Sequence, residues 1–208
     1  MKKILFITGS RGEYGYIKPI IKEIQNGTDF TFDILATNMH LIPSFGNTLH
    51  EFEKDNIPVK YKVYNTLDSY NKITTIKSLA LFLLQLPEVI DDSKPDVILI
   101  SGDRGEQLMG ALASIHMNIP VAHIQAGELS GHIDGVIRHS ITKLSTIHFS
   151  SNEDAHNRVI KLGEQPNNVF NVGAPQIDDM LDIYNLDEDI KSKYGLTKDK
   201  MFFLVVNH

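Results

Sequence analysis

The sequence predicts an α/β protein in which helices flank a parallel β-sheet. Two observations carry this prediction. Short apolar runs rich in β-branched residues alternate with helix-length segments along almost the whole chain, as in βαβ units. Several of the runs, such as residues 4–7 and 97–100, are continuously apolar, as expected of strands that helices cover on both faces. No internal repeat or low-complexity tract interrupts the alternation.

The expected elements follow one another along the chain. Pro120 stands directly before the apolar run that begins at residue 121, and Pro95 stands one residue before the run that begins at residue 97. Both prolines predict turns that leave a helix and lead into a buried strand. The predicted strands cover residues 3–8, 30–36, 59–64, 96–101, 121–125, 147–150 and 169–172. The predicted helices cover residues 16–25, 45–55, 71–91, 106–117, 134–145 and 153–162.

Two apolar segments bear on membrane and export signals. Residues 73–86 contain Lys77 and Gln85 and fall well short of the roughly 20 residues of a membrane span, so a helix largely buried against the sheet is predicted, with Pro87 at its end or at a kink. The run at 4–8 is too short for the apolar region of a signal peptide. We therefore expect a cytoplasmic protein without a membrane partner.

Composition narrows the possible functions. The 208 residues include 20 Lys+Arg and 26 Asp+Glu, which gives a net charge of −6. Nucleic-acid binding is not expected, because no positive charge is concentrated for phosphate contacts. The absence of Cys excludes disulfides, thiolate zinc sites and a cysteine nucleophile. The nine His show no H-x-x-x-H spacing, so neither a metal nor a cofactor is expected.

The last part of the sequence suggests a second domain. Mixed charges at 182–200 are typical of an interdomain linker, and the apolar run 201–206 then predicts another strand. A lone strand after a linker would leave an unpaired apolar edge. We therefore expect a domain at 1–181, a linker at 182–200 and the opening strand of a truncated second domain at 201–208, so that the chain is the N-terminal half of a longer protein.

The residues just after each strand are the candidates for a site, because parallel sheets of this class bind ligands outside the carboxyl ends of their strands. The turn at 9–15 is glycine-rich and contains Arg11, which suits a phosphate or a carboxylate. Its glycines match neither a dinucleotide fingerprint nor a Walker loop. The alternative is a plain strand-to-helix turn with a surface arginine.

Carboxylates follow the fourth and fifth strands. Asp103 ends the fourth strand, where the alternative role is to cap the next helix. The segment after the fifth strand contains Glu128, Asp134 and Arg138. Asp134 and Arg138 are four residues apart, so they alternatively form an ordinary ion pair on one helix face. Acids, arginines and histidines that converge on one crevice can combine proton transfer with anion recognition.

Taken together, these segments resemble the UDP-N-acetylglucosamine 2-epimerase family, and in particular the hydrolysing enzymes that begin the synthesis of sialic-acid-type sugars. The segments that carry the resemblance are residues 9–14, 102–104, 123–128, 131–144 and 173–178. The resemblance extends over the whole chain. It implies a fold of the glycosyltransferase-B type, in which two Rossmann-like domains face each other across a cleft and this chain supplies the first.

The resemblance also implies a reaction. Removal of the C2 proton of a UDP-linked N-acetylated sugar is coupled to loss of UDP from C1, and the resulting glycal-type intermediate is hydrated to the free 2-epimer. This chemistry needs a base, support for the departing diphosphate and a group that guides water. The resemblance and the clustering of acids give Asp103, Glu128, Asp134 and His208 as candidate catalytic residues. The candidate substrate-binding residues are Arg11, His40, Arg104, Gln125, Arg138 and Asp178.

One position departs from the family pattern. Many relatives have Glu where this chain has Gln125, and an amide neither gives nor takes a proton in ordinary acid–base catalysis. Either Glu128 takes part of that role, or Gln125 only positions the substrate. Which carboxylate removes the C2 proton stays open at this point.

Two other functions compete with the epimerase. A glycosyltransferase of the same two-domain type would transfer the sugar to an acceptor, and a nucleotide-sugar-binding module would perform no chemistry. The fragment alone is expected to be inactive, because the facing domain is missing. By resemblance we also expect a homo-oligomer, a dimer or tetramer, with the helices at 71–91 and 106–117 as candidate contacts.

Overall fold

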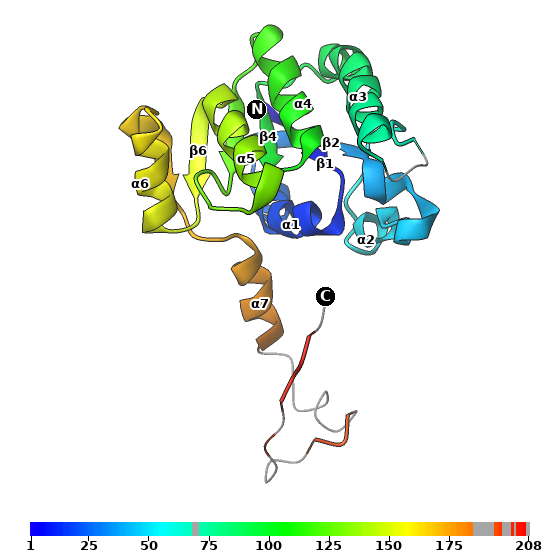
Figure 1. The fold of residues 1–208 in the computed structure, drawn as a ribbon. Helices are drawn as coiled ribbons and strands as arrows, with labels where there is room; N and C mark the ends of the chain where they lie inside the picture. Colours follow the sequence, from blue (N-terminus) through cyan, green and yellow to red (C-terminus); the bar gives the residue numbers. More distant parts are fainter. Residues whose placement is uncertain (68–70, 185–193, 197–200, 202, 207–208) are drawn as a thin grey trace.

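The computed structural model describes residues 1–67, 71–184, 194–196, 201 and 203–206. They form a seven-stranded, all-parallel sheet with helices on both faces, in the order β3-β2-β1-β4-β5-β6-β7 (Figure 1). The strands are β1 (Lys2–Thr8), β2 (Phe30–Thr37), β3 (Tyr61–Val63), β4 (Val97–Ser101), β5 (Val121–Ile124), β6 (Ile147–Ser150) and β7 (Val169–Asn171). All of the strands predicted for the first domain are present, and the predicted fold class is confirmed.

The first six helices follow the sequence prediction in order but not at every boundary, and the seventh is not among the predicted helices. The helices are α1 (Arg11–Asn26), α2 (Leu49–Lys54), α3 (Lys72–Ser93), α4 (Gly105–His116), α5 (His132–Leu144), α6 (Glu153–Lys161) and α7 (Gln176–Tyr184). α1 begins at Arg11 rather than at residue 16, because Ser10 and Glu13 form a capping box that starts the helix. α2 begins later than predicted, because a 3₁₀ turn at Pro43–Phe45 ends at Gly46, whose φ is +89°.

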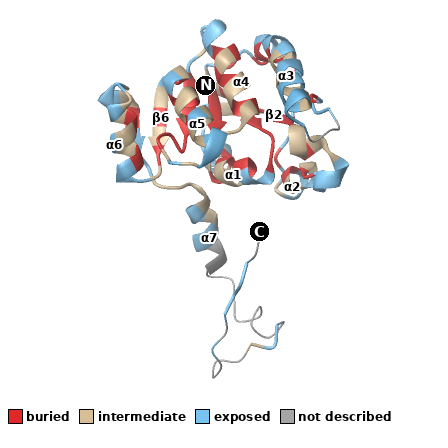
Figure 2. Cartoon of the chain, in the orientation of Figure 1, coloured by how far each residue is buried: buried red, intermediate tan, exposed pale blue. Residues whose placement is uncertain are grey.

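The buried residues concentrate in the strands and on the helix faces that cover them (Figure 2). Alternate residues of β1 point into two separate core clusters, one on each face of the sheet. Leu5 and Ile7 of β1 pack in the cluster that contains residues of α3, α4 and α5. Ile4 and Phe6 point the other way, into the cluster that contains residues of α1 and α2. The sheet is therefore fixed from both faces, and the loops at its carboxyl edge are left to form a site.

Helix α3 differs from its prediction in two ways. It runs through Pro87 to Ser93, two residues beyond the predicted end at residue 91, so the alternative in which Pro87 ends the helix is wrong. Its inner face is buried at Phe82, Leu86 and Ile90, but only 22% of its most apolar 18-residue window is buried. The expectation of a largely buried helix is therefore wrong for its outer face. By length and composition alone, α3 is also the one helix among the described residues that could span a membrane.

The predicted linker and second-domain strand lie mostly outside the described residues. Helix α7 runs to Tyr184, across the predicted boundary at 181. Met201 and residues 203–206 are exposed and form no strand here, whereas the sequence predicts one. A strand requires a neighbour for its hydrogen bonds, so an apolar run alone does not make one. The division into two domains and a linker stays a prediction.

Candidate functional site

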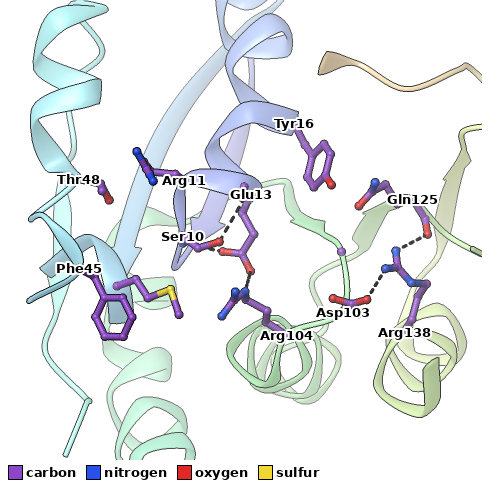
Figure 3. Close-up of a pocket in the computed structure, with 13 residues that line it drawn as sticks. Ser10, Arg11, Glu13, Tyr16, Phe45, Thr48, Asp103, Arg104, Gln125 and Arg138 are labelled. Carbon is purple, nitrogen blue, oxygen red and sulfur yellow. Dashed lines mark hydrogen bonds and ion pairs between the residues drawn. The ribbon is translucent and has the colours of Figure 1, made fainter. Parts of the chain in front are cut away.

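A polar pocket of about 470 Å³ lies at the carboxyl edge of the sheet (Figure 3). It opens between the ends of the neighbouring strands β1 and β4. From this point the chain adds β2 and β3 on one side of the sheet and β5, β6 and β7 on the other. Sheets of this class bind ligands at such a topological switch point. Half of the predicted site residues line the pocket. They are Arg11, Asp103, Arg104, Gln125 and Arg138.

Arg138 of α5 and Asp103 at the end of β4 form the centre of the site. Arg138 is 6% exposed; its Nη2 donates to the Asp103 carboxylate, and its Nη1 donates to the backbone carbonyl of Gln125 at 3.1 Å. The Ser130 hydroxyl donates to Asp103 Oδ2 at 2.9 Å and accepts from Arg138 Nη2 at 3.0 Å. Asp103 does not cap α4, whose N-cap is Arg104. The capping alternative for Asp103 is therefore wrong.

These hydrogen bonds give Arg138 and Asp103 different roles. Arg138 directs each of its three nitrogens to protein oxygens, so its role is to position Asp103 more than to bind a ligand. Both bonds to Asp103 go to Oδ2, and among the described residues Oδ1 accepts none. One carboxylate oxygen beside the pocket is thus held in place while the other stays open to a substrate.

Glu128 and Asp134 lie outside the pocket lining. Glu128 contacts the Ser151 hydroxyl, and its other oxygen is 3.8 Å from Arg138 Nη1. Asp134 is in the first turn of α5, exposed, and forms no ion pair with Arg138. The alternative of an ordinary Asp134–Arg138 pair is therefore wrong, because Arg138 turns toward Asp103 instead.

Three further predicted site residues are not brought into the pocket. His40 is fully buried, with Nδ1 2.6 Å from the hydroxyl of Thr48, a lining residue; its role is to support that wall. Burial lowers the pKa of His40 to about 4, so it is neutral there. Asp178 is in the first turn of α7 and borders a separate apolar groove beside α1. His208 lies outside the described residues.

Glu13 is a lining residue that the sequence analysis did not single out. Its Oε2 accepts from the backbone N–H groups of Gly9 and Ser10 at 2.5 and 3.1 Å, and its Oε1 is 3.9 Å from Arg104 Nε. Burial raises the pKa of Glu13 to about 7. The Ser-x-x-Glu spacing of a capping box is the signal that would have drawn attention to it.

Gln125 has an unusual backbone conformation directly after β5. Its φ is +62°, a region that costs a residue with a Cβ roughly 1–2 kcal/mol. This turn directs its carbonyl oxygen to Arg138 and leaves its side chain in the pocket lining. Local strain of this kind is common where a backbone is held for function. Among the described residues, no group of three or more His, Asp or Glu has the arrangement of a metal site.

His123 lies directly beneath this edge of the sheet, in β5. It is fully buried, and its Nε2 donates to the Gly102 carbonyl oxygen at 2.8 Å. Burial, as the main cause, lowers the pKa of His123 to about 3. The unfolded chain therefore binds a proton at His123 below about pH 6.5 while the folded protein does not, so stability is lost as the pH falls through that window.

This titration predicts a measurable acid sensitivity. Between pH 6.5 and 5, the free energy of unfolding should fall by about 1.5 kcal/mol more in the wild type than in His123→Gln, because the slope rises toward about 1.4 kcal/mol per pH unit as the pH falls below 6.5. Urea unfolding at the two pH values measures the difference. His116→Gln, a change of an exposed histidine on α4, is the control and should keep the wild-type dependence. Equal slopes in wild type and His123→Gln would contradict the prediction.

The parallel sheet with a pocket at its switch point defines a Rossmann-like domain. A comparison with known families assigns the chain more specifically than the fold does. The family model described as UDP-N-acetylglucosamine 2-epimerase matches residues 22–208. The chain belongs to the UDP-N-acetylglucosamine 2-epimerase family, as the sequence resemblance implies.

Individual relatives agree with this assignment. The chain is 36% identical over 209 residues to the Legionella pneumophila protein named UDP-N,N'-diacetylbacillosamine 2-epimerase (hydrolyzing), covering 100% of this chain and 55% of that protein. It is 34% identical to the polysialic acid biosynthesis protein P7 of Escherichia coli, over 100% of this chain and 54% of that protein. The chain thus spans about half the length of the curated relatives it matches.

Solved structures share the fold. The UDP-GlcNAc 2-epimerase of Methanocaldococcus jannaschii, in complex with UDP-GlcNAc and UDP, matches with a TM-score of 0.76 at 27% identity, covering 93% of this chain and 53% of that one. MurG of Acinetobacter baumannii shares the fold alone, with a TM-score of 0.53 at 16% identity, over 74% of this chain and 42% of that one. The predicted first domain of a glycosyltransferase-B-type fold is confirmed.

Proposed function

We propose that the full-length protein is a hydrolysing 2-epimerase of a nucleotide-activated N-acetylated sugar, UDP-N-acetylglucosamine or a related diacetamido sugar. The observation that carries the proposal is the Arg138–Asp103 pair at the switch-point pocket, because it presents an oriented carboxylate to a bound ligand. The names of the curated relatives support the same reaction class. The products are UDP and the free 2-epimer, of the N-acetylmannosamine type.

The pocket offers a division of roles for this reaction. Asp103 takes the C2 proton through its open Oδ1 while the C1–O bond to UDP breaks, which leaves a C1=C2 double bond. Arg11 and Arg104 line the same pocket and provide cations for the departing diphosphate. Water then adds across the double bond. Asp134 and His208 keep their proposed catalytic roles by motif alone.

The geometry also bears on position 125. Gln125 lines the pocket and Glu128 does not, since its carboxylate contacts Ser151 and Arg138. We therefore favour the interpretation in which Gln125 positions the substrate by hydrogen bonding. Glu128 then serves to hold Arg138.

A product assay on the full-length protein tests the proposal. With UDP-N-acetylglucosamine or its diacetamido analogue and no acceptor sugar, the enzyme should release UDP and free 2-epimer in equal amounts. UDP release that requires an acceptor would establish a glycosyltransferase instead. Binding without any release would establish a non-catalytic module. The 208-residue chain alone should show no turnover in the same assay.

The setting of the enzyme is part of the proposal. We propose a cytoplasmic homo-oligomer, a dimer or tetramer, whose partner molecule is its nucleotide-sugar substrate rather than a nucleic acid or a membrane. The net charge of −6 argues against nucleic acid as a partner, because the chain concentrates no positive charge for phosphate contacts along a polyanion.

A further inference from the structure

Glu13 has one carboxylate oxygen that the cap of α1 does not use. Its Oε2 alone accepts from both backbone N–H groups of the turn, those of Gly9 and Ser10. Its Oε1 is buried and accepts no hydrogen bond among the described residues. A buried polar atom without a partner costs free energy, so its presence calls for an explanation. Glutamine caps a helix at this position of a capping box as glutamate does, so the cap does not explain the negative charge.

Arg104, the N-cap residue of α4, lies beside this unused oxygen (Figure 3). Its Nε is 3.9 Å from Glu13 Oε1. The Arg104 side chain is 41% exposed and that of Glu13 is 5% exposed, so Arg104 is the partner that can move. Within the described residues, the two terminal nitrogens of Arg104 have no hydrogen-bond or ion-pair partner. Arg104 therefore turns its Nε edge to Glu13 and keeps Nη1 and Nη2 for a ligand in the pocket that it lines.

We propose that Glu13 is a positioning residue for nucleoside diphosphate binding: its Oε1 accepts from Arg104 Nε and thereby directs Nη1 and Nη2 at the diphosphate. The guanidinium is planar, so a hydrogen bond at Nε fixes the direction of the two terminal nitrogens. A small movement of Arg104 closes the 3.9 Å gap, and contacts of this kind often tighten when a ligand binds. The inference rests on the proposed function for its ligand, since UDP is the leaving group of that reaction.

The charge of Glu13 attracts Arg104, so the contact depends on pH. Burial, the main cause, raises the pKa of Glu13 to about 7. Glu106, in the first turn of α4, also raises it, whereas the cap hydrogen bond and Arg104 lower it. From β2 and the residue after it, Thr37 and Asn38 lie beside the same turn, and neither titrates. Glu13 is therefore mostly ionised at pH 8 and mostly protonated at pH 6, where its attraction for Arg104 is weaker.

Calorimetric titration of UDP into the full-length protein tests the contact without requiring turnover. Glu13→Gln keeps the cap through its amide oxygen and removes the charge. It should raise the Kd of UDP about tenfold at pH 8 and only about twofold at pH 6. Arg104→Gln should raise the Kd at pH 8 by at least as much. The double variant should bind UDP no more weakly than Arg104→Gln alone, because Glu13 acts only through Arg104.

Two further comparisons keep the test specific. Glu153→Gln is the matched control, because it neutralises an exposed acid in the first turn of α6, and its Kd for UDP should stay within about twofold of wild type. If Glu13→Gln does not fold, the wild type and Arg104→Gln carry the test by themselves. The ratio of their Kd values should then be larger at pH 8 than at pH 6, and an equal ratio would overturn the proposal.

Other outcomes would also overturn it. Glu13→Gln would do so if it bound UDP like the wild type, or if it weakened binding equally at pH 6 and pH 8. A double variant in which the two losses multiply would show that Glu13 does not act through Arg104. A wild type that binds no UDP would end the proposal as well. A protein that binds UDP in the expected pattern but releases none from a nucleotide sugar would refute the proposed function and leave this inference standing.

Discussion

Replacing Asp103 by Asn in the full-length protein should lower kcat for UDP release by about 10²–10⁴-fold, the usual contribution of a general base. The amide oxygen can still accept hydrogen bonds from Arg138 and Ser130, so the pocket should keep its shape. The amide cannot take the C2 proton. Steady-state measurement of UDP release gives kcat and KM separately, and the loss should appear mainly in kcat.

Two companion variants make this result specific. Asp154→Asn alters an exposed acid that pairs with Arg158 on α6, and its kcat should stay within about twofold of wild type, as expected when only a surface ion pair is lost. Glu128→Gln should lower kcat by less than about tenfold, since Glu128 lies outside the pocket and acts only through Arg138. An Asp103→Asn enzyme with near wild-type kcat would remove Asp103 from the chemistry. A loss in Glu128→Gln equal to that in Asp103→Asn would instead give Glu128 a direct part in proton transfer.

Gly127→Ala should be the most destabilising of the glycine substitutions at this edge of the sheet. Gly127 has φ +80°, and a Cβ there would lie 2.3 Å from the Ala155 carbonyl oxygen and 2.6 Å from a methyl group of Val159. The turn after β5 therefore packs against the backbone of α6 with no space for a methyl group. Backbone strain and overpacking together should lower the free energy of unfolding by about 3–5 kcal/mol. Urea unfolding of the 208-residue chain measures the loss.

Gly46→Ala is a matched control for this substitution. Gly46 has a similar φ of +89°, but nothing lies within 4 Å of a Cβ built there. It should therefore lose only the conformational part, about 1–2 kcal/mol. The difference between the two variants isolates the close approach of α6. Equal losses would mean that the contact with Ala155 relaxes at little cost.

Local signals explain why so much of the fold could be predicted. The apolar runs predicted all seven strands of the sheet in order, because a strand needs apolar side chains on each face that packs against a helix. The predicted starts of two helices were wrong, because a side-chain hydrogen bond or a left-handed turn determines where each of them begins. The start of α1 depends on a reciprocal bond between Ser10 and Glu13, and the start of α2 on the left-handed turn at Gly46.

The sequence by itself determined the fold class, the family and the candidate acids and arginines at one edge of the sheet, because periodicity, turn residues and motifs are local properties. Only the tertiary structure decided the partner of Arg138. Asp134 is four residues away and Asp103 is 35 residues away, yet Arg138 binds Asp103 because β4 and β5 are neighbours in the sheet. The same holds for α3, where the packing against the sheet buries Phe82 and leaves Leu84 exposed. These choices depend on which strands and helices become neighbours, and that is set by the packing of the whole domain.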